Sequence, residues 1–191
     1  MQISAPIHKK LFALCISALC TGAALILLIQ AGLPDRTTYS GQFIEGIGYI
    51  APEENAIAPV FADTTLNNET IALADFAGQP VIVNFWATWC APCLIELPIL
   101  QSIHEDYQND SLQIIGINMG ENPDYLRDWI ATQGLNFAMI VDEDGSHATQ
   151  YRLRGNPSTY MIAPDGTITR IFYGPADEHS LRSVIATWLE E

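Results

Sequence analysis

Hydrophobic residues along this chain fall into short continuous runs separated by stretches in which apolar residues recur at helical spacing. Three apolar runs have strand length and predict buried strands at 81–86, 112–118 and 137–141. Three segments with helical spacing predict helices at 94–107, 122–133 and 177–189. Strands that alternate with helices predict an α/β domain built on a sheet that is at least partly parallel.

Two shorter patterns predict hairpins. Residues 60–62 and 70–72 flank a polar Asn-Asn turn, and residues 159–163 and 168–173 flank Pro164-Asp165-Gly166. A single helical turn is expected at 73–76, and a short helix is expected at 146–151. Because the second hairpin adds antiparallel strands to the α/β pattern, the predicted central sheet is mixed.

The N-terminal part has a different character. Residues 11–29 carry no charge and are mostly apolar, which is about the length needed to span a bilayer as a helix. Lys9 and Lys10 precede this segment, so residues 1–10 are expected in the cytoplasm and the rest of the chain outside it. A cleaved signal peptide is the alternative, but the apolar run is longer than is usual for one. We therefore predict a single-pass protein of the cell membrane.

Residues 30–57 mix glycine, proline, threonine, serine and glutamate without a clear period. Such a composition is typical of a tether, and we expect a linker here that holds the following domain near the membrane. The folded domain is expected to occupy residues 58–191.

Charge excludes one class of function. The net charge of the chain is -14, and both lysines precede the apolar segment. From residue 30 onward, 6 arginines face 22 acidic residues, a balance of -16. Nucleic-acid phosphates need lysine and arginine, so a nucleic-acid partner is not expected.

The chain has four cysteines, of which Cys15 and Cys20 lie in the apolar segment. Cys90 and Cys93 remain, and they stand where a predicted buried strand passes into a helix. A helix N-terminus favours an anion, here the nucleophilic thiolate. Two intervening residues keep the second sulfur close enough to resolve a mixed disulfide on the first. Pro92 suits the first helical turn, where its missing N–H is not needed.

A metal site is the other interpretation of a C-x-x-C pair. There is no second pair of cysteines, and the four histidines, at 8, 104, 147 and 179, lack the H-x-x-x-H spacing of zinc ligands. We therefore predict no metal and no cofactor other than a redox-active Cys90–Cys93 disulfide.

Residues 83–93, with the sequence VNFWATWCAPC, resemble the active-site stretch of thioredoxin-fold proteins. The closer similarity is to the membrane-anchored TlpA/ResA-like thiol-disulfide oxidoreductases. It extends over residues 58–190 and includes Glu96 and the segment 155–159. The resemblance implies a thioredoxin-like fold, in which helices flank a mixed central sheet, with an N-terminal hairpin and a TlpA-type insertion at 122–141.

The resemblance also implies roles for individual residues. Cys90 would be the attacking thiol, Cys93 the resolving thiol, and Pro157 a cis-proline that faces the disulfide. A cis-proline turn can present backbone groups to an extended substrate. Asn156 departs from the apolar residue or threonine expected before that proline, which bears on substrate preference. Trp89 is a further candidate for substrate contact, as are Pro92, Asn156 and Pro157, whereas Trp86 is expected in the core.

A proton carrier is expected at Glu96. Asn84 stands where thioredoxin has a buried acid, and an amide cannot take the proton of the resolving thiol. Glu96 lies one helical turn beyond Cys93, so both side chains can face the same side. If Glu96 is buried, its pKa is raised and it can exchange protons near neutral pH. The alternative is an exposed glutamate that only complements the helix dipole.

The sequence leaves several functions open. The first is a reductase of oxidised proteins outside the cytoplasm, for which the resemblance implies apocytochrome c or a copper-site protein as substrate and a membrane electron carrier as donor. The second is an oxidase or isomerase on the same fold. A copper(I) chaperone would need a ligand such as His147 or Met119 near the two sulfurs. A peroxidase would need threonine at the position of Ala87.

Overall fold

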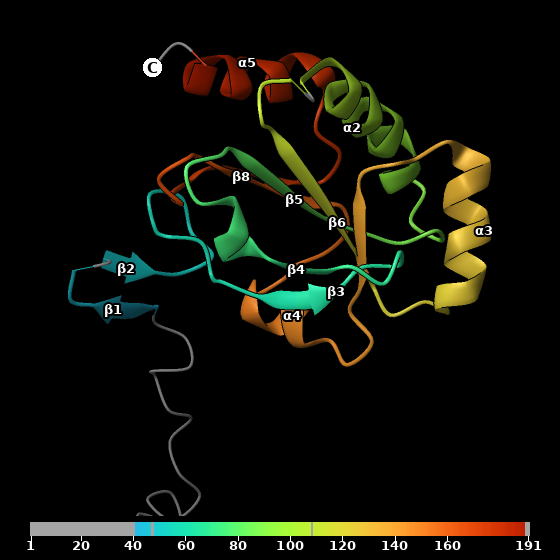
Figure 1. The fold of residues 1–191 in the computed structure, drawn as a ribbon, viewed down its shortest axis with the longest axis horizontal. Coiled ribbons are helices and arrows are strands. Elements are labelled where there is room, and N and C mark those ends of the chain that lie inside the picture. The colour runs from blue at the N-terminus through green and yellow to red at the C-terminus, as the bar shows by residue number, and fades with distance from the viewer. Residues whose placement is uncertain (1–40, 47, 108, 190–191) are drawn as a thin grey trace, which may run out of the picture. The chain divides into compact units, whose positions relative to one another are not determined.

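The computed structural model of this protein describes residues 41–46, 48–107 and 109–189. Its centre is a five-stranded sheet in the order β7-β6-β5-β8-β9 (Figure 1). The strands are β5 (Val81–Trp86), β6 (Gln113–Asn118), β7 (Ala138–Val141), β8 (Ser158–Ile162) and β9 (Ile168–Tyr173). Strands β5, β6 and β7 run parallel, whereas β8 is antiparallel to both β5 and β9. The predicted mixed sheet is confirmed.

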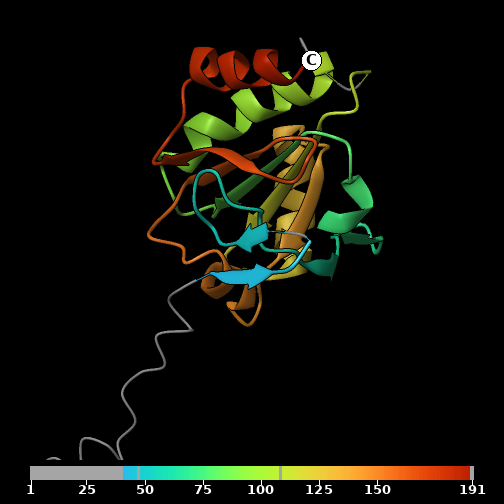
Figure 2. The same ribbon diagram turned by 90° about the vertical axis from the view of Figure 1, so that its left-hand side faces the viewer.

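Helices α2 (Cys93–Tyr107) and α5 (Glu178–Leu189) lie together on one side of the sheet in both views (Figures 1 and 2). Helix α3 (Pro123–Gln133) contributes Leu126 to the same buried cluster as residues of α2 and α5. A second cluster on the other face contains residues of β5, β6 and β8 together with Tyr151, which follows the short helix α4 (Ser146–Gln150). The core is therefore two apolar layers with the sheet between them.

Strand β5 is buried along its whole length because it lies in the middle of this sheet. Successive side chains of a strand point to opposite faces. Ile82 and Trp86 accordingly belong to the cluster under α2, whereas Val83 and Phe85 belong to the other cluster. The alternation places Asn84 on the helix-covered face, which is the face that carries the cysteines.

Smaller elements complete the described part of the chain. They are the hairpin of β1 (Gln42–Ile44) and β2 (Gly48–Ile50), the hairpin of β3 (Ala62–Thr64) and β4 (Thr70–Ala72), and the 3-10 helix η2 (Leu73–Phe76). The β3–β4 hairpin and the helical turn were predicted from sequence within one or two residues. The β1–β2 hairpin was not.

The boundary of the folded domain also differs from the sequence prediction, which placed a linker at 30–57. Residues 42–191 form one compact unit. Within the expected linker, Ala51 and Ala56 are buried, the Asn55 N–H donates to the carbonyl of Ile168, and Ile57 forms a bridge with Thr167. The segment is fixed by backbone hydrogen bonds and small side chains, which leave no periodic apolar pattern to detect.

The predicted cytoplasmic end at 1–10, the predicted anchor at 11–29 and the linker as far as residue 40 lie outside the described residues. In the part of the chain that the structure does describe, none of the helices combines the length and the hydrophobicity needed to cross a bilayer.

Candidate active site

Cys90 and Cys93 are joined as a disulfide at the N-terminus of α2. The carbonyl of Cys90 accepts hydrogen bonds from the N–H groups of Cys93, at 2.9 Å, and Leu94, at 3.3 Å. The Cys93 N–H also lies 3.3 Å from the Cys90 sulfur, so this end of the helix directs a donor at the first sulfur. Both cysteines are buried, but Cys90 is 5% exposed and Cys93 is 0% exposed, so Cys90 lies closer to the surface.

The loop between β5 and the disulfide is held by Glu121, a residue that the sequence analysis did not single out. Its carboxylate accepts hydrogen bonds from the backbone N–H of Thr88, at 2.8 Å, and from the Thr88 hydroxyl. The side-chain amide of Asn118, at the end of β6, donates to the same carboxylate at 2.8 Å. Burial opposes ionisation of Glu121, but these hydrogen bonds outweigh it and lower the pKa of the carboxyl.

The only sequence signal for Glu121 is its place just after β6. The carboxyl ends of neighbouring parallel strands meet at one edge of the sheet, so a residue there lies beside the loop that follows β5. The contact with Thr88 nevertheless depends on the tertiary fold.

Glu96 is fully buried in the first turn of α2, which excludes the alternative of an exposed glutamate. The Thr159 hydroxyl donates to its Oε1 at 2.8 Å, and the N–H of Ala176 lies 3.4 Å from the same atom. The side-chain amide of Asn84 donates to Oε2 at 3.3 Å and to the Thr159 hydroxyl at 2.8 Å. Burial raises the pKa of Glu96 to about 7, although the hydrogen bonds from Thr159, Ala176 and Asn84 act in the opposite direction.

The carboxyl of Glu96 can therefore both hold and release a proton near neutral pH, one helical turn from Cys93. The burial and the raised pKa agree with the sequence prediction, and the role of Glu96 as a proton carrier stays a prediction. Asn84 of β5 donates a hydrogen bond to this carboxyl through its side-chain amide. The Oδ1 atom of Asn84 is buried without a partner among the described residues.

The peptide bond between Asn156 and Pro157 is cis, as the resemblance implied. Ser158, the next residue, pairs with Phe85 of β5 on one side and with Tyr173 of β9 on the other. Pro157 therefore lies beside the end of β5, the same end from which the chain continues to Cys90. Its carbonyl accepts a hydrogen bond from the N–H of Gly174 at 2.9 Å.

The two tryptophans before the cysteines are in different environments. Trp86 is fully buried and packs against Trp129, with ring centroids 5.4 Å apart, so its predicted core position is confirmed. Trp89 is 69% exposed, and Leu94 and Ile95 in the first turn of α2 are also exposed. Pro92 is half-buried directly before α2. The disulfide thus lies next to an apolar surface formed by Trp89, Leu94 and Ile95.

Comparison with known proteins places the chain in a family. The sequence model of the AhpC/TSA family matches residues 55–171, more than half of the chain. The chain belongs to the AhpC/TSA family. It is 29% identical over 158 residues to the thiol-disulfide oxidoreductase ResA of Bacillus subtilis, covering 83% of this chain and 85% of ResA. It is 30% identical over 155 residues to the thioredoxin-like protein YneN of the same organism, covering 80% of this chain and 88% of YneN.

Solved structures agree with this assignment. The crystal structure of StoA from Bacillus subtilis matches with a TM-score of 0.59 and 28% identity, over 65% of this chain and 95% of StoA. The structure described as a thiol:disulfide interchange protein DsbE from Chlorobium tepidum matches with a TM-score of 0.67 over 72% of this chain and 98% of that chain. At 24% identity, the second match supports the fold. The predicted similarity to ResA-like proteins is confirmed.

This member of the AhpC/TSA family has Ala87 three residues before its first redox cysteine, and Ala87 is buried. An alanine offers no hydroxyl at the position where the peroxidase interpretation requires a threonine. The site therefore gives no support for peroxidase chemistry.

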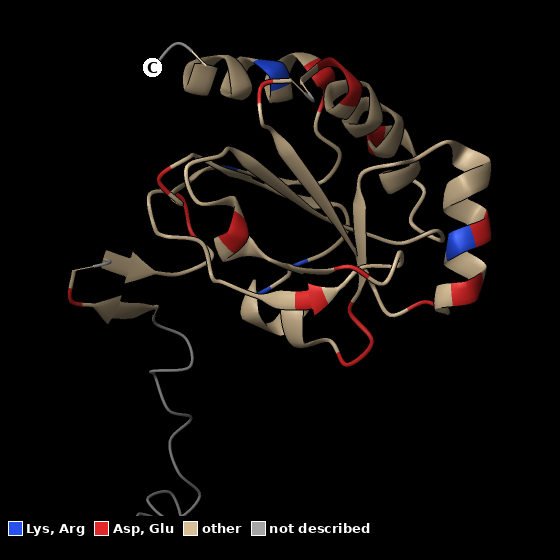
Figure 3. Ribbon diagram, viewed as in Figure 1, with Lys and Arg blue, Asp and Glu red and all other residues tan. Residues whose placement is uncertain are grey.

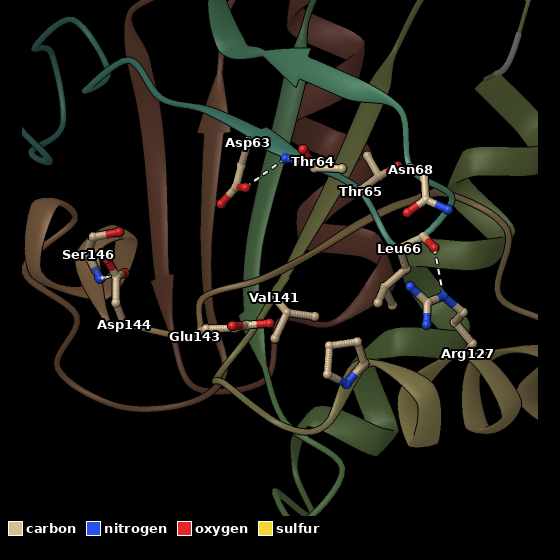
Figure 4. Close-up of a pocket in the computed structure, with 11 residues that line it drawn as sticks. Asp63, Thr64, Thr65, Leu66, Asn68, Arg127, Val141, Glu143, Asp144 and Ser146 are labelled. Carbon is tan, nitrogen blue, oxygen red and sulfur yellow. Dashed lines mark hydrogen bonds between the residues drawn. The ribbon is translucent and has the colours of Figure 1, made fainter.

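The histidine that a copper chaperone would need is not with the cysteines. His147 is buried, lies 2.8 Å from the Asp63 carboxylate and packs against Phe61 in the cluster on the other face of the sheet. Asp63 lines a cavity of about 490 Å³ together with Glu143 and Asp144, and no cysteine lines this cavity (Figure 4). Within the described ranges, no group of three or more His, Cys, Asp or Glu side chains could hold a metal ion.

Proposed function

We propose that this chain is a thiol-disulfide oxidoreductase that reduces disulfides in proteins outside the cytoplasm. The observation that carries the proposal is the Cys90–Cys93 disulfide at the N-terminus of α2, in which Cys90 is the less buried residue and Cys93 lies one helical turn from a buried carboxyl whose pKa is about 7. Curated relatives across more than four fifths of the chain are named thiol-disulfide oxidoreductases.

The reaction runs in two exchanges. The Cys90 thiolate attacks one sulfur of the substrate disulfide, forming a mixed disulfide and releasing the first substrate thiolate, which takes a proton from solvent. Cys93 then loses its proton to Glu96 and attacks the Cys90 sulfur, which breaks the mixed disulfide and releases the second substrate thiolate. That thiolate takes a proton from solvent, and Glu96 returns its proton to solvent before the next cycle. The substrate gains two electrons and two protons, and the Cys90–Cys93 dithiol becomes the disulfide.

The direction of electron flow is supported by the two residues between the cysteines. Ala91-Pro92 contains no histidine that could stabilise the thiolate and make the disulfide strongly oxidising. By resemblance, apocytochrome c or a copper-site protein is the substrate, and a membrane thiol-disulfide carrier restores the dithiol. The predicted anchor at 11–29 would keep the domain at the outer face of the cell membrane.

Trp89, Pro92, Asn156 and Pro157 form the proposed substrate-binding surface. An extended substrate segment would lie along the cis-proline loop, with its cysteine against Cys90 and its apolar side chains on the surface of Trp89, Leu94 and Ile95. Exposed apolar side chains beside a reactive group are typical of protein interaction sites.

A two-way exchange assay tests this function. Reduced protein is mixed with an oxidised peptide disulfide, and oxidised protein with the same peptide as a dithiol, with no other thiol present. We expect electrons to pass mainly from protein to peptide, as measured by chromatography of the peptide forms after acid quenching. Exchange in which the peptide becomes oxidised at equilibrium would instead assign the chain as a disulfide donor.

A further inference from the structure

Arg154 differs from the other arginines that the structure describes. Arg127, Arg152, Arg170 and Arg182 each form an ion pair with an acidic residue. Arg154 forms none with any acid in the described ranges, and its guanidinium lies over the ring of Tyr173, 5.1 Å from the centroid. Acidic residues are spread over the helices and loops of the domain, with few basic ones (Figure 3). Arg154 is thus an exposed cation without an acidic partner among the residues that the structure describes.

Arg154 lies close to the cis-proline loop. It stands three residues before Pro157, and Tyr173 pairs with Ser158 directly after that proline. The N–H of Gly174, which follows Tyr173, donates to the Pro157 carbonyl at 2.9 Å. Arg154 and Tyr173, which are in cation–π contact, thus flank the cis-proline loop next to the path proposed for the substrate.

The two side chains line a pocket of about 240 Å³ with Arg152, Ile171, Glu53 and Glu54. Both carboxylates in this pocket are already engaged. Glu53 accepts from Arg152 at 3.0 Å, and Glu54 accepts from the N–H of Ile171 at 3.0 Å. Of the two arginines that line this pocket, Arg154 is thus the one without an acidic partner among the described residues, and its donors can bind an incoming anion beside Ile171 and Tyr173.

We propose that Arg154 binds an acidic side chain of the substrate protein and thereby selects substrate segments with aspartate or glutamate near the reactive cysteine. The inference rests on the proposed function, because it names a specificity residue for the same exchange. Phe85, Ser158 and Tyr173 lie on three adjacent strands, which spans roughly 10 Å at about 4.8 Å per strand. At about 3.3 Å per residue, an extended substrate covers that span in roughly three residues.

Arginine suits this role because its planar guanidinium can donate two parallel hydrogen bonds to a carboxylate. The guanidinium carbon lies 5.1 Å from the centre of the Tyr173 ring, a cation–π contact that keeps the charge beside the cis-proline loop. The site is exposed, so we expect selection by about fivefold in rate, which is the upper end of what exposed ion pairs contribute. The selection should decrease as salt is added.

The test uses three peptide disulfides that differ only in a glutamate, glutamine or lysine placed three residues from the reactive cysteine, made in versions with the variable residue on either side. We expect the unmodified protein, in reduced form, to react about five times faster with the glutamate peptide than with the glutamine peptide. Its reaction with the lysine peptide should be slower than that with the glutamine peptide. R154Q should remove these differences, and R154E should reverse them.

R170Q is the matched control, because Arg170 is also exposed and also lies over an aromatic ring, that of Phe172, but is paired with Glu54. It should keep the preference for glutamate. Equal rates of the unmodified protein with all three peptides, on both sides of the cysteine, would overturn the role of Arg154 and leave the oxidoreductase function intact. Absence of exchange with every peptide would overturn the proposed function itself.

Discussion

Replacing Cys90 with serine is expected to abolish disulfide reduction, with a loss in rate of roughly 10³-fold or more, because the group that forms the covalent intermediate is removed. Cys93 cannot take over the attack, since its sulfur is buried and has no access to a partner. The measurement is the second-order rate of peptide-disulfide reduction by the Cys90→Ser variant, with far-UV circular dichroism to show that the variant is folded.

The companion variant, Cys93→Ser, should leave the first attack intact and block the second. We expect a mixed disulfide between Cys90 and the substrate to accumulate, which mass spectrometry of tryptic peptides would locate. Since Cys93 lies in the core, Cys93→Ala serves the same purpose if a buried hydroxyl prevents folding. A trapped substrate on Cys93, or an undiminished rate in Cys90→Ser, would contradict the assigned roles.

Glu96→Gln is expected to slow the resolving step by about 10²-fold and to remove its dependence on an ionisation near pH 7. Above its pKa of about 7 the carboxylate can take the proton of Cys93, and below that pH it cannot. The rate at which a preformed mixed disulfide on Cys90 is resolved should therefore rise through pH 7 in the unmodified protein. A profile for Glu96→Gln that follows the unmodified one would show that Glu96 does not carry the proton.

The same pKa shift predicts a change in stability. Because burial raises the pKa from 4.5 to about 7, the folded state keeps a proton between these pH values that the unfolded state has released. The stabilising contribution is fully present below pH 4.5 and is lost as the pH rises through 7, a change of about 3 kcal/mol in the free energy of unfolding. Glu96→Gln removes this contribution to the pH dependence. As the pH rises from 4 to 8, the free energy of unfolding of the variant should therefore increase relative to that of the unmodified protein.

Glu121→Gln provides a control of opposite sign for the stability measurement. The pKa of Glu121 is lowered, so its contribution is present above its unfolded pKa and is lost as the pH falls through the folded one. Urea unfolding of both variants would compare them directly, with the series extended to well below pH 4.5 so that it includes the titration of Glu121. A stability difference for Glu96→Gln that does not change with pH would mean that the carboxyl titrates in the folded protein as it does in the unfolded chain.

The central sheet could be predicted from the sequence because local pattern and tertiary environment agree there. Residues 81–86 form a continuous apolar run apart from Asn84, and the strand is buried on both faces. Pro157 and Glu96 could be found because their spacing from the cysteines follows the family pattern. The helix predicted at 122–133 is also present as α3, in which Leu126 is buried and Tyr125 is exposed.

What the sequence did not reveal depends on contacts between distant segments. The folded unit begins at Gln42 because backbone groups of residues 51–57 pair with Ile168 and its neighbours more than a hundred residues away. Glu121, which follows β6, accepts a hydrogen bond from Thr88, which follows β5. Arg154, which precedes β8, contacts the ring of Tyr173 at the end of β9. None of these contacts leaves a periodic or spaced motif, so only the fold could place them.

The reduction potential of the Cys90–Cys93 pair tests the central claim most directly. The domain would be equilibrated with thiol buffers of defined potential, and the fractions of dithiol and disulfide measured after alkylation. A reductase that depends on an outside electron source should have a value near or below roughly -250 mV, in the range of thioredoxin. A value near about -120 mV, like that of strong periplasmic oxidants, would contradict the account and make the chain a disulfide donor.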